Sequence, residues 1–256
     1  MKRHLFSLLA LCTFCVLFSA SKTSKMATTA TVPIKTPNYD YKPPESTTKT
    51  GVTLALVKPI FARSMKYSEC RVFKDFSDHM ASDFEEMITK RGYTLRGPFQ
   101  GADDMVFDDK KTCPLYLQPE ILIDMDFSNV YSHTQSNTEF DGTRFVAVNS
   151  YWYDGTITLT SRINMLFVEP FSNEKIKTLS ISLPQKSILV KSNSRMREDN
   201  FYSVFLDHSD AGIINPVIIA LEEYYQSCFT TAYKHLDPQE IAIYVKDAQA
   251  ARDRHK

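Results

Sequence analysis

The order of hydrophobic patterns along the chain predicts an α+β fold, with a mixed or antiparallel sheet and helices packed on one face. Three observations carry this prediction. A strand-helix-strand start is indicated by a β-rich run at 52–62, a helical period at 77–91 and a short β-rich segment at 93–99. A β-meander follows over 119–183, where apolar and polar residues alternate. Two helical patterns then close the chain, which completes an α+β layer architecture.

The N-terminus has the features of an export signal. Lys2 and Arg3 precede an apolar run at 5–18, and small residues follow at 19–21, so a signal peptide is predicted over 1–21. The run is about 14 residues long, whereas a membrane-spanning helix needs about 20. A retained signal anchor is the alternative. Lipid attachment at Cys12 or Cys15 is disfavoured, because neither cysteine follows a small residue.

Two further segments complete the predicted organisation. Residues 22–50 are rich in Thr, Lys, Ser and Pro and show no apolar period, which predicts a disordered or extended tether. Residues 51–256 are long enough for a single α+β domain with its own core. The chain has 30 basic and 30 acidic residues and a formal net charge of zero. This balance predicts no nucleic-acid partner and no membrane contact except through an N-terminal anchor.

The first helix, expected at 77–91, carries one apolar stripe with helical spacing and ends at Gly92. The residues of the stripe are Phe76, Met80, Phe84, Met87 and Ile88. The acidic stretch 101–111 is expected to form a loop or one short helix. At the C-terminus, Asn215-Pro216 and Asp237-Pro238 each read as the start of a helix, because proline is well suited to the first helical position.

Within the meander, Ile121 and Ile123 alternate with Asp124 and Asp126, as in a strand with one solvated face. The segments 144–153 and 156–170 flank Asp154-Gly155, which predicts a two-residue hairpin turn at that dipeptide. Pro170 is expected to end the second arm, because proline cannot donate to a sheet ladder. Residues 176–183 then return as another strand.

No motif for catalysis, a cofactor or a metal ion is present, and the histidines have no ligand spacing. We therefore expect a protein that is not an enzyme and has no cofactor. One cluster has the character of a binding site, namely the aromatic residues Tyr151, Trp152 and Tyr153. On a strand, Tyr151 and Tyr153 share one face and Trp152 takes the other. At least one of the three must be structural, and the cluster is a candidate for ligand or partner contact.

Three cysteines follow the predicted signal peptide: Cys70, Cys113 and Cys228. An oxidising compartment permits one disulfide among them. Cys70 and Cys113 both precede regular elements and are the candidate pair, although the sequence does not establish the connectivity. Cys228 lies on the apolar face of a predicted helix and is expected to be buried.

Four segments resemble the neuraminyllactose-binding haemagglutinin family of Gram-negative envelope proteins: 54–62, 88–95, 165–183 and 243–254. The chain is similar to a distant member of that family. The resemblance implies an outer-membrane or surface protein, and the family is named for binding sialylated sugars. Members carry a lipoprotein signal and a basic-Thr cluster after the strand that opens the meander. Here the corresponding stretch, 126–142, has no lysine or arginine, so no sugar-binding residue is carried over.

Together these observations predict an exported, non-catalytic binding protein of the cell envelope, adhesin- or haemagglutinin-like, with a host glycan as one candidate ligand. The alternative is a periplasmic or outer-membrane accessory module that docks an envelope protein through a sheet edge or the aromatic strand. Periplasm, outer membrane and cell surface are all compatible locations.

Overall fold

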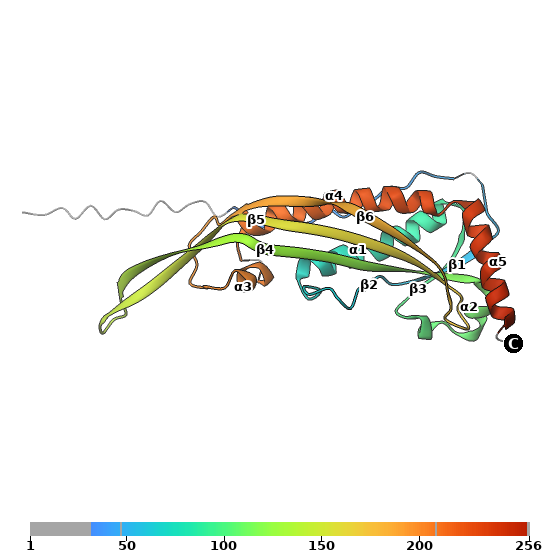
Figure 1. Cartoon of the computed structure of the whole chain (residues 1–256), viewed down its shortest axis with the longest axis horizontal. Helices are drawn as coiled ribbons and strands as arrows, with labels where there is room; N and C mark the ends of the chain where they lie inside the picture. Colours follow the sequence, from blue (N-terminus) through green and yellow to red (C-terminus); the bar gives the residue numbers. More distant parts are fainter. Residues whose placement is uncertain (1–31, 47, 208, 255–256) are drawn as a thin grey trace, which may run out of the picture. The chain divides into compact units, whose positions relative to one another are not determined.

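The computed structural model describes residues 32–46, 48–207 and 209–254. The predicted signal peptide and the first part of the predicted tether lie outside the described residues. The described chain is an α+β domain built on one six-stranded sheet with the order β3-β1-β4-β5-β6, in which β2 also pairs with β4 (Figure 1). The strands are β1 (Thr53–Val57), β2 (Ile60–Phe61), β3 (Thr94–Phe99), β4 (Leu115–Phe140), β5 (Phe145–Val168) and β6 (Lys175–Lys191). The helices are α1 (Arg71–Lys90), η1 (Ala102–Asp104), α2 (Phe107–Thr112), α3 (Phe201–Leu206), α4 (Ala211–His235) and α5 (Pro238–Arg254).

The strand-helix-strand start is a parallel crossover, because β1 pairs in parallel with β3 and α1 connects them. The predicted stripe of α1 is confirmed, and Phe76, Met80 and Phe84 have no exposed surface. The helix begins at Arg71, six residues before the predicted start. The acidic stretch forms η1 and the short helix α2.

The sheet is buried differently on its two faces. On the inner face, β4 and β5 contribute residues such as Ile121 and Ile163 to a large core that also contains α1 and α4. On the outer face, a smaller cluster gathers around Ala55, Cys113 and Tyr116 at the end of the sheet near α2. Along β4, β5 and β6, the residues on the rest of the outer face are half-buried or exposed, and most of them are polar. The α+β prediction is confirmed, and most of the outer face of β4, β5 and β6 is accessible to solvent.

The prediction of a hairpin turn at Asp154-Gly155 is wrong. β5 runs without interruption through this dipeptide, and the turn between β4 and β5 lies at Asp141–Arg144. Gly155 has φ +143 and pairs with Val130 next to an irregularity in β4. A Cβ atom there would lie 2.1 Å from the carbonyl oxygen of Asn129. Glycine is therefore required at this point by a close backbone approach beside a β-bulge.

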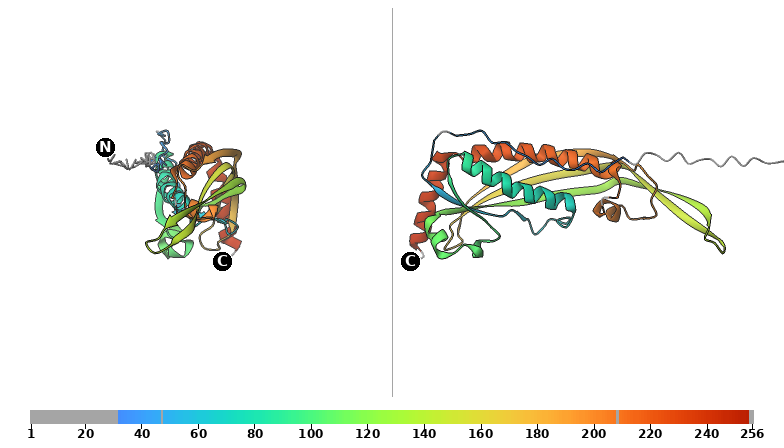
Figure 2. Two further views of the ribbon diagram at one scale, coloured as in Figure 1. Left: turned by 90° about the vertical axis from the view of Figure 1, so that its left-hand side faces the viewer. Right: turned by 180° about the vertical axis from the view of Figure 1, so that it is seen from behind.

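The two C-terminal helices are present. α5 begins at Pro238 as predicted, with the Asp237 side chain accepting from the Gln239 N–H. α4 begins at Ala211 and not at Pro216, because the Asp210 carboxylate caps it by accepting from the Gly212 N–H at 2.8 Å. α4 lies along the inner face of the sheet, and α5 crosses the end of the sheet (Figures 1 and 2).

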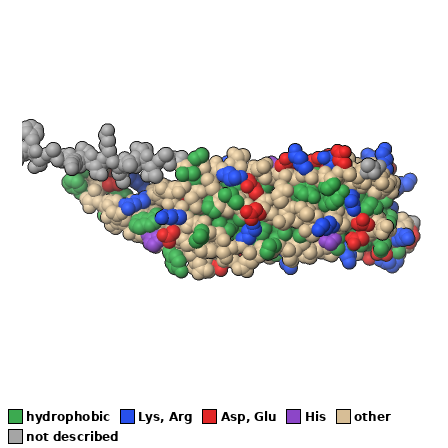
Figure 3. Space-filling model, turned by 90° about the horizontal axis from the view of Figure 1, so that it is seen from above, with side chains coloured by type: hydrophobic (Ala, Val, Ile, Leu, Met, Phe, Trp, Pro, Cys, Tyr) green, Lys and Arg blue, Asp and Glu red, His purple; other side chains and the backbone are tan. Residues whose placement is uncertain are grey.

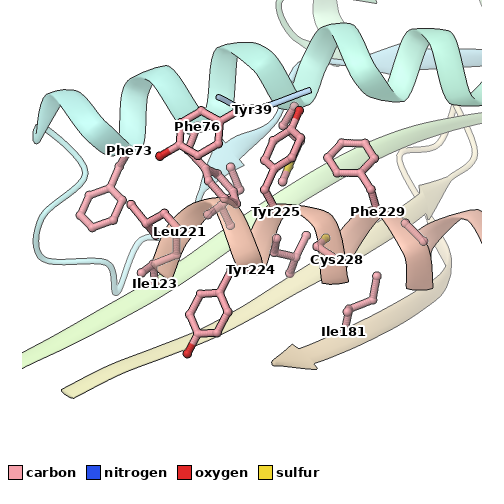
Figure 4. Packing of buried hydrophobic residues seen from close by; sticks show 14 of the residues in the cluster. Tyr39, Phe73, Phe76, Ile123, Ile181, Leu221, Tyr224, Tyr225, Cys228 and Phe229 are labelled. Carbon is pink, nitrogen blue, oxygen red and sulfur yellow. The ribbon is translucent and has the colours of Figure 1, made fainter. Parts of the chain in front are cut away.

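Residues 32–46, called the strap here, form neither helix nor strand but pack on α1 and α4. Tyr39 is 2% exposed, and its ring lies 5.3 Å from that of Phe76 and 5.2 Å from that of Tyr225 (Figure 4). Tyr41 stacks on Phe229 at 5.3 Å. Lys35 forms an ion pair with Glu222 of α4. In residues 32–46, part of the segment predicted to be a disordered or extended tether, the chain packs on the domain with two tyrosines buried in the core.

Candidate functional site

The three aromatic residues singled out in the sequence have separate roles in β5. Tyr153 is 1% exposed, packs against Phe201 and donates to the carbonyl of Glu198 at 3.0 Å. Tyr151 is half-buried, and its backbone exchanges hydrogen bonds of 2.7 and 2.8 Å with Met196. Trp152 points to the outer face. The expectation that at least one of the three is structural is confirmed for Tyr153.

Trp152 is half-buried and is flanked by polar residues from both sides of β5. The imidazole of His133, opposite it on β4, stacks on the indole at 5.3 Å and 16°. The guanidinium of Arg195, from the segment beyond β6, lies 5.1 Å from the ring centroid. The Nε2 atom of His133 lies 3.2 Å from a carboxylate oxygen of Asp154, without the alignment of a hydrogen bond. The indole is thus held as part of a mixed aromatic and charged surface.

The same surface continues toward β6. Tyr131 pairs with Asp154 across the strands and is 61% exposed, and Leu189 on β6 is 78% exposed. Beside them lies a hollow of about 530 Å³ at the junction of β5, β6 and α4. We call the whole surface the Trp152 patch, and its residues are Tyr131, His133, Trp152, Asp154, Leu189, Lys191 and Arg195. An exposed ring, apolar surface and both signs of charge together can hold a polar ligand that has an apolar face.

A second hollow, of about 370 Å³, lies farther along the outer face. Lys66, Asp124 and Arg162 line it together with serine and threonine side chains. Ser161 also lines it, and the Ser161 hydroxyl is buried with no hydrogen-bond partner among the described residues. No aromatic residue lines this hollow, so it offers polar contacts and no ring for stacking.

Beyond the Trp152 patch, β4 and β5 continue as a projecting hairpin, residues 135–150 (Figure 2). Its tip presents Phe140 and Phe145, which are 60% and 75% exposed and whose rings lie 5.3 Å apart. Tyr151 directs its N–H and C=O away from β4 toward Met196. Because successive residues of a strand alternate, the N–H and C=O groups of Phe145, Ala147 and Asn149 also point away from β4, to the same edge of β5. In the part of the chain that the structure describes, these groups have no backbone partner at that edge.

The candidate disulfide between Cys70 and Cys113 is not formed. Cys70 belongs to the large core on the inner face, and Cys113 belongs to the smaller cluster on the outer face. The sheet therefore separates the two thiols. Cys228 is buried in α4 as predicted.

Neither a metal centre nor a membrane-crossing helix is evident in residues 32–46, 48–207 and 209–254. No group of three or more His, Cys, Asp or Glu residues in these ranges could hold a metal ion. None of the helices there is long and apolar enough to cross a membrane. Basic and acidic side chains are interspersed on the face seen in Figure 3 and not gathered by sign.

Sequence reasoning found Trp152 but missed the residues around it. His133 and Arg195 are separated from Trp152 by 19 and 43 positions, which follow from their numbers in the chain. Only the pairing of β4 with β5, and the return of the chain beyond β6, bring them together. The exposed aromatic residue of the patch, Tyr131, belongs to a predicted strand, but the sequence did not indicate its position beside Asp154.

Comparison with family models finds no match, and comparison with curated proteins finds none either. Among solved structures, the chain is similar to one described as a homolog of the neuraminyllactose-binding haemagglutinin from Helicobacter pylori. The two are 15% identical with a TM-score of 0.54, and the match covers 84% of this chain and 98% of that one.

Two other solved structures are more distant, and they contribute nothing to the assignment. One is a protein of Xanthomonas campestris, with 10% identity, a TM-score of 0.31 and coverage of 81% of this chain and 99% of that one. The other is a lipoprotein of Neisseria meningitidis, with 11% identity, a TM-score of 0.25 and coverage of 62% and 93%. The resemblance indicated by the sequence is thus confirmed at the level of the fold, which this chain shares with the Helicobacter pylori haemagglutinin homolog.

Proposed function

We propose that the protein is an exported, non-catalytic binding protein of the cell envelope that holds a glycan on the Trp152 patch. The observation that carries the proposal is the exposed ring of Tyr131 beside a partly exposed Trp152, on a sheet face with charged donors and acceptors. The fold shared with a homolog of a haemagglutinin named for neuraminyllactose supports a sugar as the ligand class. The signal-like N-terminus supports export.

The chemistry of the patch suits a sugar in two ways. Aromatic rings offer a flat apolar surface to the C–H face of a pyranose, and here that surface is Tyr131 with the accessible part of Trp152. Hydroxyl groups need donors and acceptors around that surface, which Asp154, Lys191 and Arg195 supply. Because His133 and Arg195 flank the Trp152 indole, stacking directly on this ring requires that Arg195 move aside.

The test is a glycan array followed by titration of any sugar that binds. The variant Y131A should weaken binding about tenfold or more, since it removes a stacking contact of roughly 1.5 kcal/mol. R162A is the matched control, because Arg162 lies on the same sheet face but in the other hollow. Binding that is lost with R162A and kept with Y131A would move the site to that hollow. The absence of any glycan binding would refute the proposal.

The alternative function is an accessory module that docks an envelope protein by strand addition. The specific observation in its favour is the edge of β5 at Phe145, Ala147 and Asn149, where outward backbone groups have no partner among the described residues. A147P removes an outward N–H and leaves the pairing with β4 intact. A partner held at this edge, captured by crosslinking in cells, should be lost in A147P and kept in Y131A. Capture that survives A147P would rule out this edge.

A further inference from the structure

The tip of the projecting hairpin is apolar without being part of any core. Phe140 and Phe145 face each other across the strands and are mostly exposed. The charges around them are paired and balanced, with Arg144 3.6 Å from Asp141 and Arg197 3.2 Å from Glu139. Two exposed phenylalanines at the end of a two-stranded hairpin are costly in water, and a hairpin of this kind is only marginally stable by itself. This arrangement calls for an apolar surrounding at the tip.

The tip projects from the same end of the domain at which the chain enters. The strap begins beside the first turns of α4, where the Asn215 side chain donates to the carbonyl of Pro33 and accepts from the N–H of Lys35. The start of α4 in turn lies against β6, because a Cβ on Gly212 would lie 1.9 Å from the carbonyl oxygen of Lys191. Lys191 pairs with Asp154 at the base of the hairpin. From there the hairpin extends past the start of α4 (Figures 1 and 2).

The lengths involved allow the tip to reach a surface that holds the N-terminus. Phe140 lies nine positions beyond Tyr131, which is at the level of Lys191, so the tip projects about 30 Å at ~3.4 Å per residue. The apolar run ends at Phe18, fourteen positions before Val32. That stretch spans at most roughly 45 Å. Attachment through the N-terminal segment therefore does not hold the tip away from the membrane.

We propose that the Phe140–Phe145 tip inserts into the surface of the membrane to which the N-terminal segment is attached. A tip of two rings is far smaller than the ~1,200 Å² that a stable protein interface buries. A bilayer needs only a few apolar anchors when a second attachment is present. The inference rests on the proposed envelope location and on the apolar run at 5–18 being kept as a signal anchor, the alternative to its cleavage. It does not depend on any ligand at the Trp152 patch.

The experiment uses the full chain held by an N-terminal histidine tag on vesicles of phosphatidylethanolamine and phosphatidylglycerol with chelating lipids. Because Trp152 is the single tryptophan of the chain, the variant W152F/F145W carries its only indole at the tip. The matched control is W152F/F107W. Phe107 is 68% exposed and forms a similar pair with Phe171 at the opposite end of the domain. Circular dichroism checks that both variants are folded.

We expect the emission of W152F/F145W to shift to shorter wavelength on vesicles and to be lost when the acyl chains are brominated. The emission of W152F/F107W should not change. Equal quenching of both variants, or of neither, overturns the proposal, as does crosslinking of the tip to an envelope protein when lipid has no effect. Since the tag supplies the attachment and Trp152 is replaced, failure of the glycan proposal leaves this test unaffected.

Discussion

The hydroxyl of Tyr225, on α4, donates a hydrogen bond of 2.8 Å to the carboxylate of Asp83, on α1. Asp83 is 8% exposed, and the same carboxylate oxygen accepts from the N–H of Tyr41 in the strap at 2.7 Å. One buried acid therefore joins two helices and the strap. Burial raises the pKa of Tyr225 far above its usual value, so its hydroxyl stays a donor.

This contact predicts a dependence of stability on pH. Burial raises the pKa of Asp83 above its usual 3.8. Because the folded state holds this proton more tightly than the unfolded state, Asp83 contributes stability that is fully present below pH 3.8 and is lost as pH rises through the raised pKa. Urea denaturation should show that the free energy of unfolding of the wild type rises relative to that of D83N as the pH falls through this range. A difference that does not vary with pH contradicts the prediction.

The strap predicts opposite effects for two substitutions of Tyr39. Its ring is buried between Phe76 and Tyr225, and its hydroxyl is buried without a hydrogen-bond partner among the described residues. Y39A should lower the free energy of unfolding by roughly 3 kcal/mol, because it leaves a cavity. Y39F should leave stability unchanged or raise it, since it removes an unpaired buried polar group. Chemical denaturation measures both, and a loss in Y39F similar to that in Y39A would show that the hydroxyl is satisfied.

Because the three thiols are buried, we expect them to react slowly with thiol reagents in the native state. Burial raises the pKa of Cys70 and of Cys113 to about 11, and that of Cys228 to about 12. A thiol reagent at neutral pH should therefore modify none of the three until the domain is unfolded, and then modify all three without a reductant. Intact mass counts the modifications. Modification of only one of them after unfolding would indicate a disulfide, contrary to the structure.

Two glycines with positive φ predict different costs for the same substitution. Gly155 has the carbonyl oxygen of Asn129 where a Cβ would be placed, whereas Gly142, in the hairpin turn, has open space. G142A should cost about 1 kcal/mol through its backbone conformation alone. G155A should cost more than about 2 kcal/mol, because backbone strain and a clash add. Thermal denaturation ranks the two, and equal costs would mean that the bulge relaxes freely.

Two neighbouring arginines of α5 form a further matched pair. Arg252 binds the fully buried carboxylate of Glu169 at 2.8 Å, and Arg254 binds the partly exposed Glu174 at 2.7 Å. R252A should destabilise the domain by roughly 3 kcal/mol, because it leaves a buried carboxylate without its cation. R254A should cost less than about 1 kcal/mol. Urea denaturation at one pH tests the difference, and similar values for both variants would show that water reaches Glu169.

The sequence predicts those parts of the fold in which a local pattern and the final packing agree. The stripe of α1, the alternation in β4 and the start of α5 at Pro238 are of this kind. The hairpin turn is not, because Asp-Gly occurs at both 141–142 and 154–155. Only the first is a turn, and the second lies at a close backbone approach beside a bulge. Which dipeptide turns the chain depends on the register of two long strands, a property that short-range patterns do not contain.

The same distinction separates what could be predicted of the strap and the candidate site. Tyr39 lies in a segment of linker-like composition, yet its ring partner Tyr225 is 186 positions away, as their numbers show. Trp152 was identifiable as an aromatic residue on a strand, but its partners His133 and Arg195 come from other segments. Residue type indicated where binding is chemically plausible, and long-range pairing determined which faces of the rings remain accessible.

The strap also decides how the domain responds to mechanical force. A pull on the N-terminus acts first on the contacts of Lys35, Tyr39 and Tyr41 with the two helices, before any strand is loaded. These contacts follow one another along the segment, so a pull reaches them one after another. The released strap spans at most about 50 Å, while the strands of the sheet are not part of it. In a domain attached by its N-terminus, a pull is therefore taken up by the strap before it reaches the sheet.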